Sequence, residues 1–334
     1  MTAMKRTLWT GAITAAALGL TALPVSAETY TLIGASQFDE DHAFTKLMRR
    51  FEELVHEYYD GPDEVVFELH LNSELGLEKD YFEYMSQGIS VDYAVVSPSH
   101  MSTFSQMAPL MDMPFLFRDI DHWNAVLDSD ALQPIVDDIY ENGDVLLIGY
   151  GGGGTRNLIV NRPISNMEEL AGLPIRVMGS PIQTMIFEAI NAAPTVIAYD
   201  EVYNAIQTGV IDAAENESAG IEQMRFYEVG PYIALTQHAI TVRPLCIAGA
   251  TLRSLPEDLQ AAILQAGKEA GEYGRMLESS QDGEKLAAME EAGYLTTVEF
   301  TERDRLLELA EPVKQQYAEE LGATEVLAAI NAVE

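Results

Sequence analysis

From residue 30 onward, short apolar runs alternate with longer stretches that are apolar on one face only. Residues 30–35 and 65–69 are rich in β-branched and aromatic side chains, which is typical of strands. The stretch between them has the i, i+3, i+4, i+7 spacing of a helix, with Phe44, Leu47, Met48, Phe51, Leu54, Val55 and Tyr58 on one face. A second helix is expected at 77–86, before Gly88, and a third strand at 93–96. This order of elements predicts a parallel sheet covered by helices.

A similar unit is expected after the glycines at 151–154, which form the sharpest change of composition in the chain. A helix at 132–140 and a strand at 144–150 precede them. The elements expected after them are a short helix between a capping box at 165–168 and Gly172, a strand at 173–177, a helix at 181–190, a strand at 195–197 and a helix at 200–207 that stops at Gly209. We expect the glycines to be a flexible crossing, because glycine accepts large changes of φ and ψ.

The last third of the chain is expected to recross to the first unit. It contains a strand at 240–248 and a second capping box at 254–257, which opens a long helix whose apolar face extends to Leu277. A further helix is expected at 301–321. The predicted fold class is therefore α/β, with two α/β units, more than one crossing and a cleft between them. Such clefts, at the carboxyl ends of strands, are common ligand sites.

The N-terminus has the pattern of a removable export signal. Lys5 and Arg6 precede an apolar stretch at 8–23, and Val25-Ser26-Ala27 is a small-residue cleavage site. Cleavage after Ala27 would leave a chain that begins at Glu28. A membrane anchor is the alternative, but it calls for about 20 predominantly apolar residues without a cleavage pattern. We therefore predict a signal peptide over residues 1–27 and a periplasmic location.

The charge balance is strongly acidic, with 53 Asp and Glu against 19 Lys and Arg and a net charge of −34. Loss of the two basic residues of the signal would take it to −36. This excludes a nucleic-acid partner, because phosphate contacts require a basic face. Six lysines against thirteen arginines indicate an acidic surface of the halophilic type, suited to a salty medium. Cys246 is the single cysteine, and its apolar surroundings predict a buried, unreactive thiol.

No motif for catalysis or for a cofactor is found. The six histidines are scattered, without His-Glu-x-x-His, and there is no Gly-x-Ser-x-Gly elbow. The glycines at 151–154 lack the Lys-Ser/Thr ending of a phosphate loop. The acidic clusters at 39–41 and 119–121 lack the full calcium-loop pattern. We therefore expect no enzyme, no metal and no cofactor.

Arg176 is the strongest candidate for a binding residue. It lies in the apolar run 173–177, and burial of an unpaired guanidinium is costly. An acidic partner is therefore needed. The residues alone leave two possibilities open: an internal salt bridge to Glu215 or Asp200, or the carboxylate of a ligand.

Several segments resemble the TRAP-type periplasmic solute-binding proteins, the receptor subunits of secondary transporters. The signature segments are 172–178, 201–212 and 215–216, and those that agree in order and spacing are 73–76, 87–89, 113–117, 162–164, 226–229, 236–238 and 255–260. The resemblance covers essentially the whole chain after the signal. It implies a periplasmic-binding-protein-like fold, with two α/β lobes, a ligand cleft and a long hinge-spanning helix. It also implies capture of a small organic acid, delivery to TRAP membrane permease subunits and no catalysis.

The lobes implied by the resemblance are discontinuous. The N-terminal lobe would consist of 28–151 plus about 241–283, and the C-terminal lobe of 152–240 plus about 284–334. Family members usually carry larger residues at 152–154. This chain has glycines there, and this departure from the family predicts a roomier site beside Arg156.

The resemblance also assigns roles to residues. Arg176 corresponds to the invariant arginine that pairs with the ligand carboxylate. Arg156 corresponds to a second arginine, which contacts the ligand or braces the crossing. Asn216 and Tyr199 are further ligand candidates, with a helix cap and core packing as their alternatives. From the N-terminal lobe the candidates are Ser97, Ser99, His100, Gln37, Phe38 and Glu74, of which Glu74 is either a hydroxyl ligand or a surface carboxylate.

The favoured ligand is a sugar acid such as a uronate, because the region from 195 to 216 resembles the sugar-acid binders of the family. A C4-dicarboxylate, a hydroxy or keto acid, or a compatible solute is the alternative within the family. Two other classes stay open: a secreted sugar-acid enzyme, and a ligand-sensing subunit of a membrane receptor.

Overall fold

The computed structural model describes residues 27–334, so all but the last residue of the predicted export signal lies outside the described residues. The first unit has the predicted order of elements. These are β1 (Thr29–Ala35), α1 (Ala43–Tyr58), β2 (Glu64–His70), α2 (Glu78–Gln87) and β3 (Tyr93–Val95). β1 pairs in parallel with both β2 and β3. The predicted apolar face of α1 is buried, with Leu47 and Phe51 fully enclosed.

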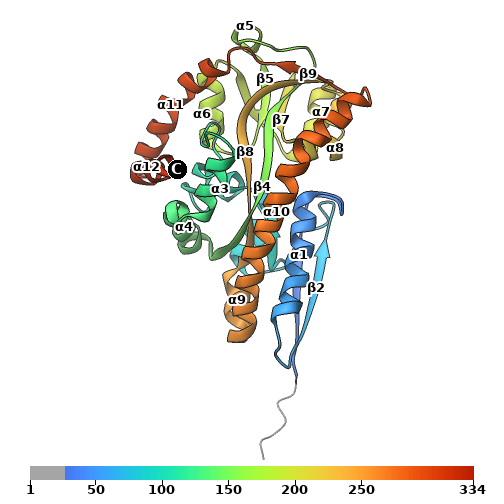
Figure 1. Cartoon of the computed structure of the whole chain (residues 1–334), viewed down its shortest axis with the longest axis vertical. Helices are drawn as coiled ribbons and strands as arrows, with labels where there is room; N and C mark the ends of the chain where they lie inside the picture. Colours follow the sequence, from blue (N-terminus) through green and yellow to red (C-terminus); the bar gives the residue numbers. More distant parts are fainter. Residues whose placement is uncertain (1–26) are drawn as a thin grey trace, which may run out of the picture.

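Two long strands join this unit to the next. β4 (Val145–Val160) and β8 (Tyr232–Ala248) pair antiparallel in the middle of a nine-stranded sheet, whose order is β2-β1-β3-β8-β4-β7-β5-β6, with β9 (Thr296–Glu299) on β8. Figure 1 shows both strands running through the whole molecule. The two lobes therefore share one sheet, and the mixed α/β architecture agrees with the predicted fold class.

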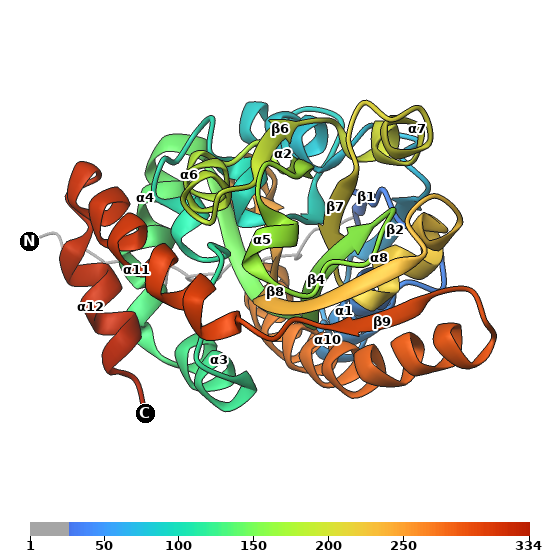
Figure 2. The same cartoon turned by 90° about the horizontal axis from the view of Figure 1, so that it is seen from above.

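The second unit also follows the predicted alternation. Its elements are α5 (Met167–Leu170), β5 (Pro174–Val177), α6 (Pro181–Ala189), β6 (Ala193–Val196), α7 (Val202–Gln207), β7 (Ala213–Asn216) and α8 (Ser218–Gln223). The remaining helices are α3 (Ile120–Asp128), α4 (Gln133–Gly143), α9 (Gly249–Ser254), α10 (Glu257–Glu291), α11 (Arg303–Glu320) and α12 (Thr324–Ala332). Figure 2 shows α11 and α12 at the opposite side of the molecule from α7 and α8. No helix of the part that the structure describes is long and apolar enough to cross a bilayer.

The glycines of β4 pack closely against neighbouring elements, and the flexible crossing at 151–154 stays a prediction. α10 runs along β4 for much of its 35 residues (Figure 1). A Cβ on Gly149 would lie 2.0 Å from the carbonyl oxygen of Gly267, and a Cβ on Gly271 would lie 2.5 Å from the backbone nitrogen of Tyr150. Helix and strand therefore meet backbone to backbone. Strand pairing continues through Gly151 and Gly152, which face residues of β8.

Both predicted capping boxes are wrong in detail. α5 is capped by Asn166, whose Oδ1 accepts from the N–H of Glu169 at 3.0 Å. The Glu169 carboxylate in turn accepts from the N–H and hydroxyl of Ser165, so the reciprocal pair is shifted by one residue. Ser254 ends α9 and donates to the carbonyl oxygen of Thr251 instead of capping α10. α10 begins after Pro256 without a side-chain cap.

Candidate ligand-binding site

A cavity of about 320 Å³ lies between the two halves of the sheet. Segments that follow strands form its walls. Gln37 follows β1, Ser99, His100, Ser102 and Thr103 follow β3, Gly179 follows β5, and the residues from Ile197 to Tyr199 follow β6. At the start of α2, Leu77, Lys79 and Asp80 close one side. The cavity therefore lies at the carboxyl ends of parallel strands, where open α/β sheets bind ligands, and its volume is in the range of about 300–1,000 Å³ usual for such sites.

Arg176 enters this cavity without an acidic partner among the described residues. Only 3% of the residue is exposed. Its Nε donates to the carbonyl oxygen of Ile197 at 2.9 Å, while its two amino nitrogens have no hydrogen-bond partner in the part of the chain that the structure describes. The guanidinium carbon lies 5.8 Å from the centre of the Tyr199 ring. Burial lowers the pKa of Arg176, and the negative charge of Glu215 opposes that shift. A buried, oriented cation of this kind favours binding of an anion.

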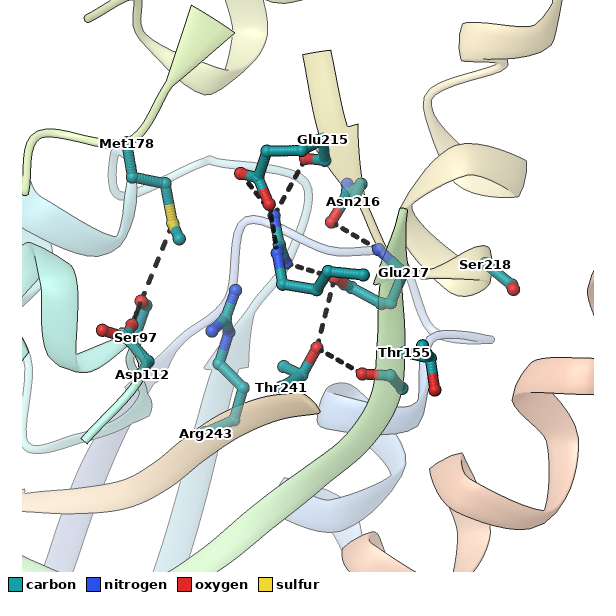
Figure 3. A network of polar contacts seen from close by, with 12 residues as sticks. Ser97, Asp112, Thr155, Met178, Glu215, Asn216, Glu217, Ser218, Thr241 and Arg243 are labelled. Atoms are coloured by element: carbon teal, nitrogen blue, oxygen red, sulfur yellow. Dashed lines mark hydrogen bonds and ion pairs between the residues drawn. The ribbon is translucent and has the colours of Figure 1, made fainter. Parts of the chain in front are cut away.

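Glu215, one of the two internal partners considered for Arg176, is bound by Arg156 instead. The Arg156 Nε lies 2.5 Å from one Glu215 oxygen, and Nη2 lies 2.9 Å from the other. Arg156 also donates to Glu217, whose carboxylate accepts from Thr241 (Figure 3). Burial raises the pKa of Glu215, but the charge of Arg156 and the hydrogen bonds from His238 and Arg156 together hold that pKa well below its usual range. Arg156 thus braces β4 against β7, and its contact with a ligand stays a prediction.

Asn216 lies behind Tyr199. Its Nδ2 donates to the Tyr199 hydroxyl at 3.0 Å, and its Oδ1 accepts from the N–H of Glu217 at 3.1 Å. Tyr199 is among the residues that line the cavity, and burial raises the pKa of its hydroxyl. The Phe38 ring, from the loop after β1, lies 6.2 Å from the Tyr199 ring in an edge-on arrangement. Phe38 and Asn216 therefore hold Tyr199 from opposite halves of the molecule.

The loop after β3 brings together three of the predicted residues. Ser99 and His100 line the cavity, whereas Ser97 is fully buried behind them. The Ser97 hydroxyl donates to Asp112 at 2.6 Å (Figure 3). The Ser99 hydroxyl donates to the same carboxylate at 2.8 Å, and both bonds keep the loop in place. Burial, followed by the positive charge of Arg176, lowers the pKa of His100 to about 3. The imidazole is therefore neutral at physiological pH and can accept or donate one hydrogen bond to a ligand.

Gln37 and Glu74 differ in their surroundings. Gln37 lines the cavity, and its Oε1 accepts from the N–H of Glu78 at 3.3 Å. Glu74 is exposed, lies 3.1 Å from Nδ1 of His70 and is not among the residues that line the cavity. The surface role considered for Glu74 therefore agrees with its position, and its contact with a ligand stays a prediction.

Three buried residues next to the cavity were not predicted from the sequence: Asp112, Glu78 and Arg243. Arg243 is 5% exposed and lies on β8, with its Nε 3.7 Å from a Glu78 oxygen. Its sequence signal is the same as that of Arg176: an arginine inside an apolar strand, here within 241–245. Asp112 is likewise a lone acidic residue within the apolar stretch 108–116. An isolated charge in an apolar run could therefore have identified two of these three residues.

The extra room expected beside Arg156 does not exist. A Cβ on Gly152 would lie 2.1 Å from the carbonyl oxygen of Thr241, and one on Gly154 would lie 2.6 Å from a Glu278 oxygen. The space that larger residues would occupy is filled by β8, by the segment after β7 and by α10. This corrects the expectation of a larger site on that side.

No group of three His, Cys, Asp or Glu side chains suited to a metal ion occurs among residues 27–334. Cys246 is buried and unpaired, as predicted, and burial raises the pKa of its thiol. The absence of a metal or cofactor from the function stays a prediction.

Two lobes that share one sheet, with a buried cationic side chain in the cavity between them, define a binding protein for small anionic solutes. Comparison with known families agrees with this class. Residues 34–321 match the family model described as bacterial extracellular solute-binding protein, family 7, and the chain belongs to this family.

Relatives and solved structures of this family cover nearly the whole chain. A solute-binding protein of Sulfitobacter sp. (strain NAS-14.1) is 54% identical over 321 residues, which are 96% of this chain and 97% of the relative. A crystal structure of a TRAP periplasmic solute-binding protein from Sulfitobacter sp. NAS-14.1, with bound α-D-taluronate, is 56% identical, with a TM-score of 0.89 and coverage of 90% of this chain and 97% of that one. A TRAP periplasmic solute-binding protein from Roseobacter denitrificans, with bound β-D-glucuronate, is 25% identical, with a TM-score of 0.84 and coverage of 91% and 100%.

Proposed function

We propose that this protein is a periplasmic receptor for a sugar acid, with a uronate as the favoured ligand, and that it delivers the ligand to a TRAP-type membrane permease without chemical change. The observation that carries the proposal is the buried Arg176 guanidinium, which has two amino nitrogens without a protein partner in the described chain. A planar guanidinium binds a carboxylate through two parallel hydrogen bonds, which also fixes the orientation of the ligand.

The sugar part of the ligand would lie among polar groups from both lobes. Ser99, His100 and Gln37 offer hydrogen-bonding groups on one side, and Tyr199 offers a ring face and hydroxyl on the other. Asn216, Phe38, Ser97 and Arg156 would hold these side chains in position. Glu74 is the predicted contact that the geometry supports least, because its carboxylate is exposed and pairs with His70. Support for a uronate comes from the two solved relatives, which bind α-D-taluronate and β-D-glucuronate.

The lobes would move as the two discontinuous units expected from the sequence, 28–151 with about 241–283 and 152–240 with about 284–334. β4, β8 and α10 cross between these units and would form the hinge. Two contacts join the halves beside the cavity. The Ser102 hydroxyl donates to the carbonyl oxygen of Gly179 at 3.2 Å, and the Ser97 hydroxyl lies 3.8 Å from the Met178 sulfur. A ligand held by both sides would favour an arrangement with these contacts through its differential affinity.

Calorimetry tests the proposal on the chain that begins at Glu28. The panel comprises D-taluronate, D-glucuronate, D-galacturonate and succinate, with D-glucose and D-galactose as uncharged controls. We expect one uronate to bind with 1:1 stoichiometry, no binding of the neutral sugars and an unchanged NMR spectrum of the bound acid after release. Preferred binding of succinate would favour the C4-dicarboxylate alternative. Turnover of the acid would favour the secreted enzyme, and absence of binding to every acid would overturn the proposal.

A further inference from the structure

A second buried arginine, Arg243, has few partners among the described residues. It belongs to β8, directly before the residues that pair with β3. Within residues 27–334 its side chain makes one hydrogen bond, from Nη1 to the carbonyl oxygen of Val242 at 3.1 Å. Its Nε is buried and has no hydrogen-bond partner in that part of the chain, and its guanidinium carbon lies 5.3 Å from the centre of the Phe44 ring. Figure 3 shows the side chain directed away from its strand, into the region flanked by Ser97 and Glu215.

Arg243 differs from Arg176 in having carboxylates close by. The nearest is Glu78, whose Oε1 lies 3.7 Å from the Arg243 Nε. Glu78 is 1% exposed, and its other oxygen accepts from the N–H of Ser97 at 2.6 Å. Asp112 is also buried, and burial raises the pKa of both carboxyl groups, while the positive charge of Arg243 opposes that shift. This end of the site therefore offers hydrogen-bond donors and acceptors together, without a net positive charge.

Arg243 and Glu78 adjoin the cavity that Arg176 enters. The pKa of His100, which lines the cavity, is lowered first by burial, then by the charge of Arg176 and then by that of Arg243. The charge of Glu78 in turn supports the protonated form of Arg176. Gln37 joins the Arg243 end to the cavity wall, because its amide nitrogen lies 3.5 Å from the same Glu78 oxygen that faces Arg243.

We infer that Arg243 and Glu78 are specificity-determining residues that bind the hydroxyl end of the ligand and reject a second carboxylate there. The inference rests on the proposed function, in which Arg176 binds the single carboxylate. A hydroxyl both donates and accepts, so neighbouring hydroxyls match a guanidinium beside a carboxylate. A second ligand carboxylate would face Glu78 and Asp112 in a poorly solvated space, where like charges repel strongly. The receptor therefore selects sugar monoacids over the corresponding diacids.

Calorimetry with a uronate and its matching diacid, D-glucuronate with D-glucarate or D-galacturonate with galactarate, tests this inference. The wild-type protein is compared with Glu78→Gln, which removes the negative charge but keeps the size of the side chain. We expect the wild type to favour the uronate, and Glu78→Gln to reduce the uronate-to-diacid ratio of affinities at least tenfold by improving diacid binding. A uronate is largely ring-closed, whereas the diacid is open-chain. This difference between the ligands affects both proteins equally, so it does not change the comparison of Glu78→Gln with the wild type.

Arg243→Met is the second variant, because methionine keeps the apolar stem over Phe44. We expect it to weaken uronate binding about 10- to 100-fold, since charged hydrogen bonds contribute roughly 1.5–3 kcal/mol each. Arg253→Met, at an exposed salt bridge to Asp144, is the matched control and is expected to bind as the wild type does. Circular dichroism and thermal unfolding check that each variant is folded.

The outcomes separate this inference from the proposed function. If the wild type binds no sugar acid, the proposed function fails and the inference falls with it. If the wild type binds a uronate through Arg176 but Glu78→Gln leaves the ratio of affinities unchanged, the inference alone is overturned. Wild-type affinity in a folded Arg243→Met variant would overturn it as well. If Arg243→Met does not fold, the uronate-to-diacid ratio of affinities measured with Glu78→Gln tests the inference by itself.

Discussion

Glu215 gives both of its carboxylate oxygens to Arg156, at 2.5 and 2.9 Å, and forms no ion pair with Arg176. The third contact of Glu215 is with Nε2 of His238, at 3.2 Å. Glu215, one of the two possible internal partners for Arg176, is therefore bound by other side chains. This arrangement leaves the Arg176 guanidinium available to a ligand, and it predicts opposite consequences for the loss of the two arginines.

Replacement of Arg176 should abolish ligand binding and spare the fold. Arg176→Ala removes two charged hydrogen bonds of roughly 1.5–3 kcal/mol each, so we expect uronate affinity to fall at least 100-fold. Arg176→Lys should also bind poorly, because a point charge cannot replace the planar fork. Calorimetry measures the affinity, and urea unfolding measures the stability. Near-unchanged affinity in Arg176→Ala would count against the proposed site.

Replacement of Arg156 should mainly destabilise the protein. Arg156→Met leaves Glu215 and Glu217 buried without their cation, and breaking a buried pair in this way costs about 3–5 kcal/mol. Urea unfolding at pH 7 gives the change in free energy. If Arg156→Met is as stable as the wild type but does not bind the ligand, Arg156 contacts the ligand. The family resemblance implies this contact as the alternative to a bracing role.

The stability of the protein should respond to pH through Glu278. This residue of α10 is 2% exposed, neither of its carboxyl oxygens has a hydrogen-bond partner in the described chain, and burial raises its pKa well above the usual value. The folded state therefore keeps the Glu278 proton at pH values where the unfolded chain releases it. The contribution of Glu278 to stability is present below the unfolded pKa, near 4.5, and is lost as the pH rises from there toward the folded pKa.

Glu278→Gln tests this pH dependence, because glutamine stays neutral at every pH. We expect the variant to be more stable than the wild type at pH 7–8, with the difference shrinking as the pH approaches 4.5. Urea unfolding across this range measures it. Equal stabilities of the two proteins at pH 8 would contradict the assignment of a buried, protonated carboxyl group.

The contact between α10 and β4 should tolerate no side chain at Gly149. The Cβ of Gly149→Ala would lie 2.0 Å from the carbonyl oxygen of Gly267, so the helix must shift away from the strand. We expect a loss of more than about 3 kcal/mol in the free energy of unfolding. Gly283→Ala on α10 is the matched control, because nothing lies within 4 Å of its Cβ. That variant should gain about 0.5–1 kcal/mol from helix propensity.

The sequence by itself determined the alternation of strands and helices, because periods of 2 and 3.6 residues are local properties of the chain. The buried face of α1 and the parallel pairing of β1 with β2 and β3 followed from these periods. Arg176 was also identifiable, since a charge inside an apolar run needs a partner. The acidic composition excluded a nucleic-acid partner, because phosphate contacts require a basic face.

Only the tertiary structure decided which groups meet across large sequence separations. Arg156 pairs with Glu215, 59 residues away, and this contact determines which of the two arginines lacks an internal partner. The glycines of β4 are packing positions because α10, more than 100 residues later, lies against them. Arg243 and Glu78 come together from β8 and α2. The local sequence pattern shows which side chains are buried and require a partner. Strand order and helix packing determine which residue, distant in the sequence, is that partner.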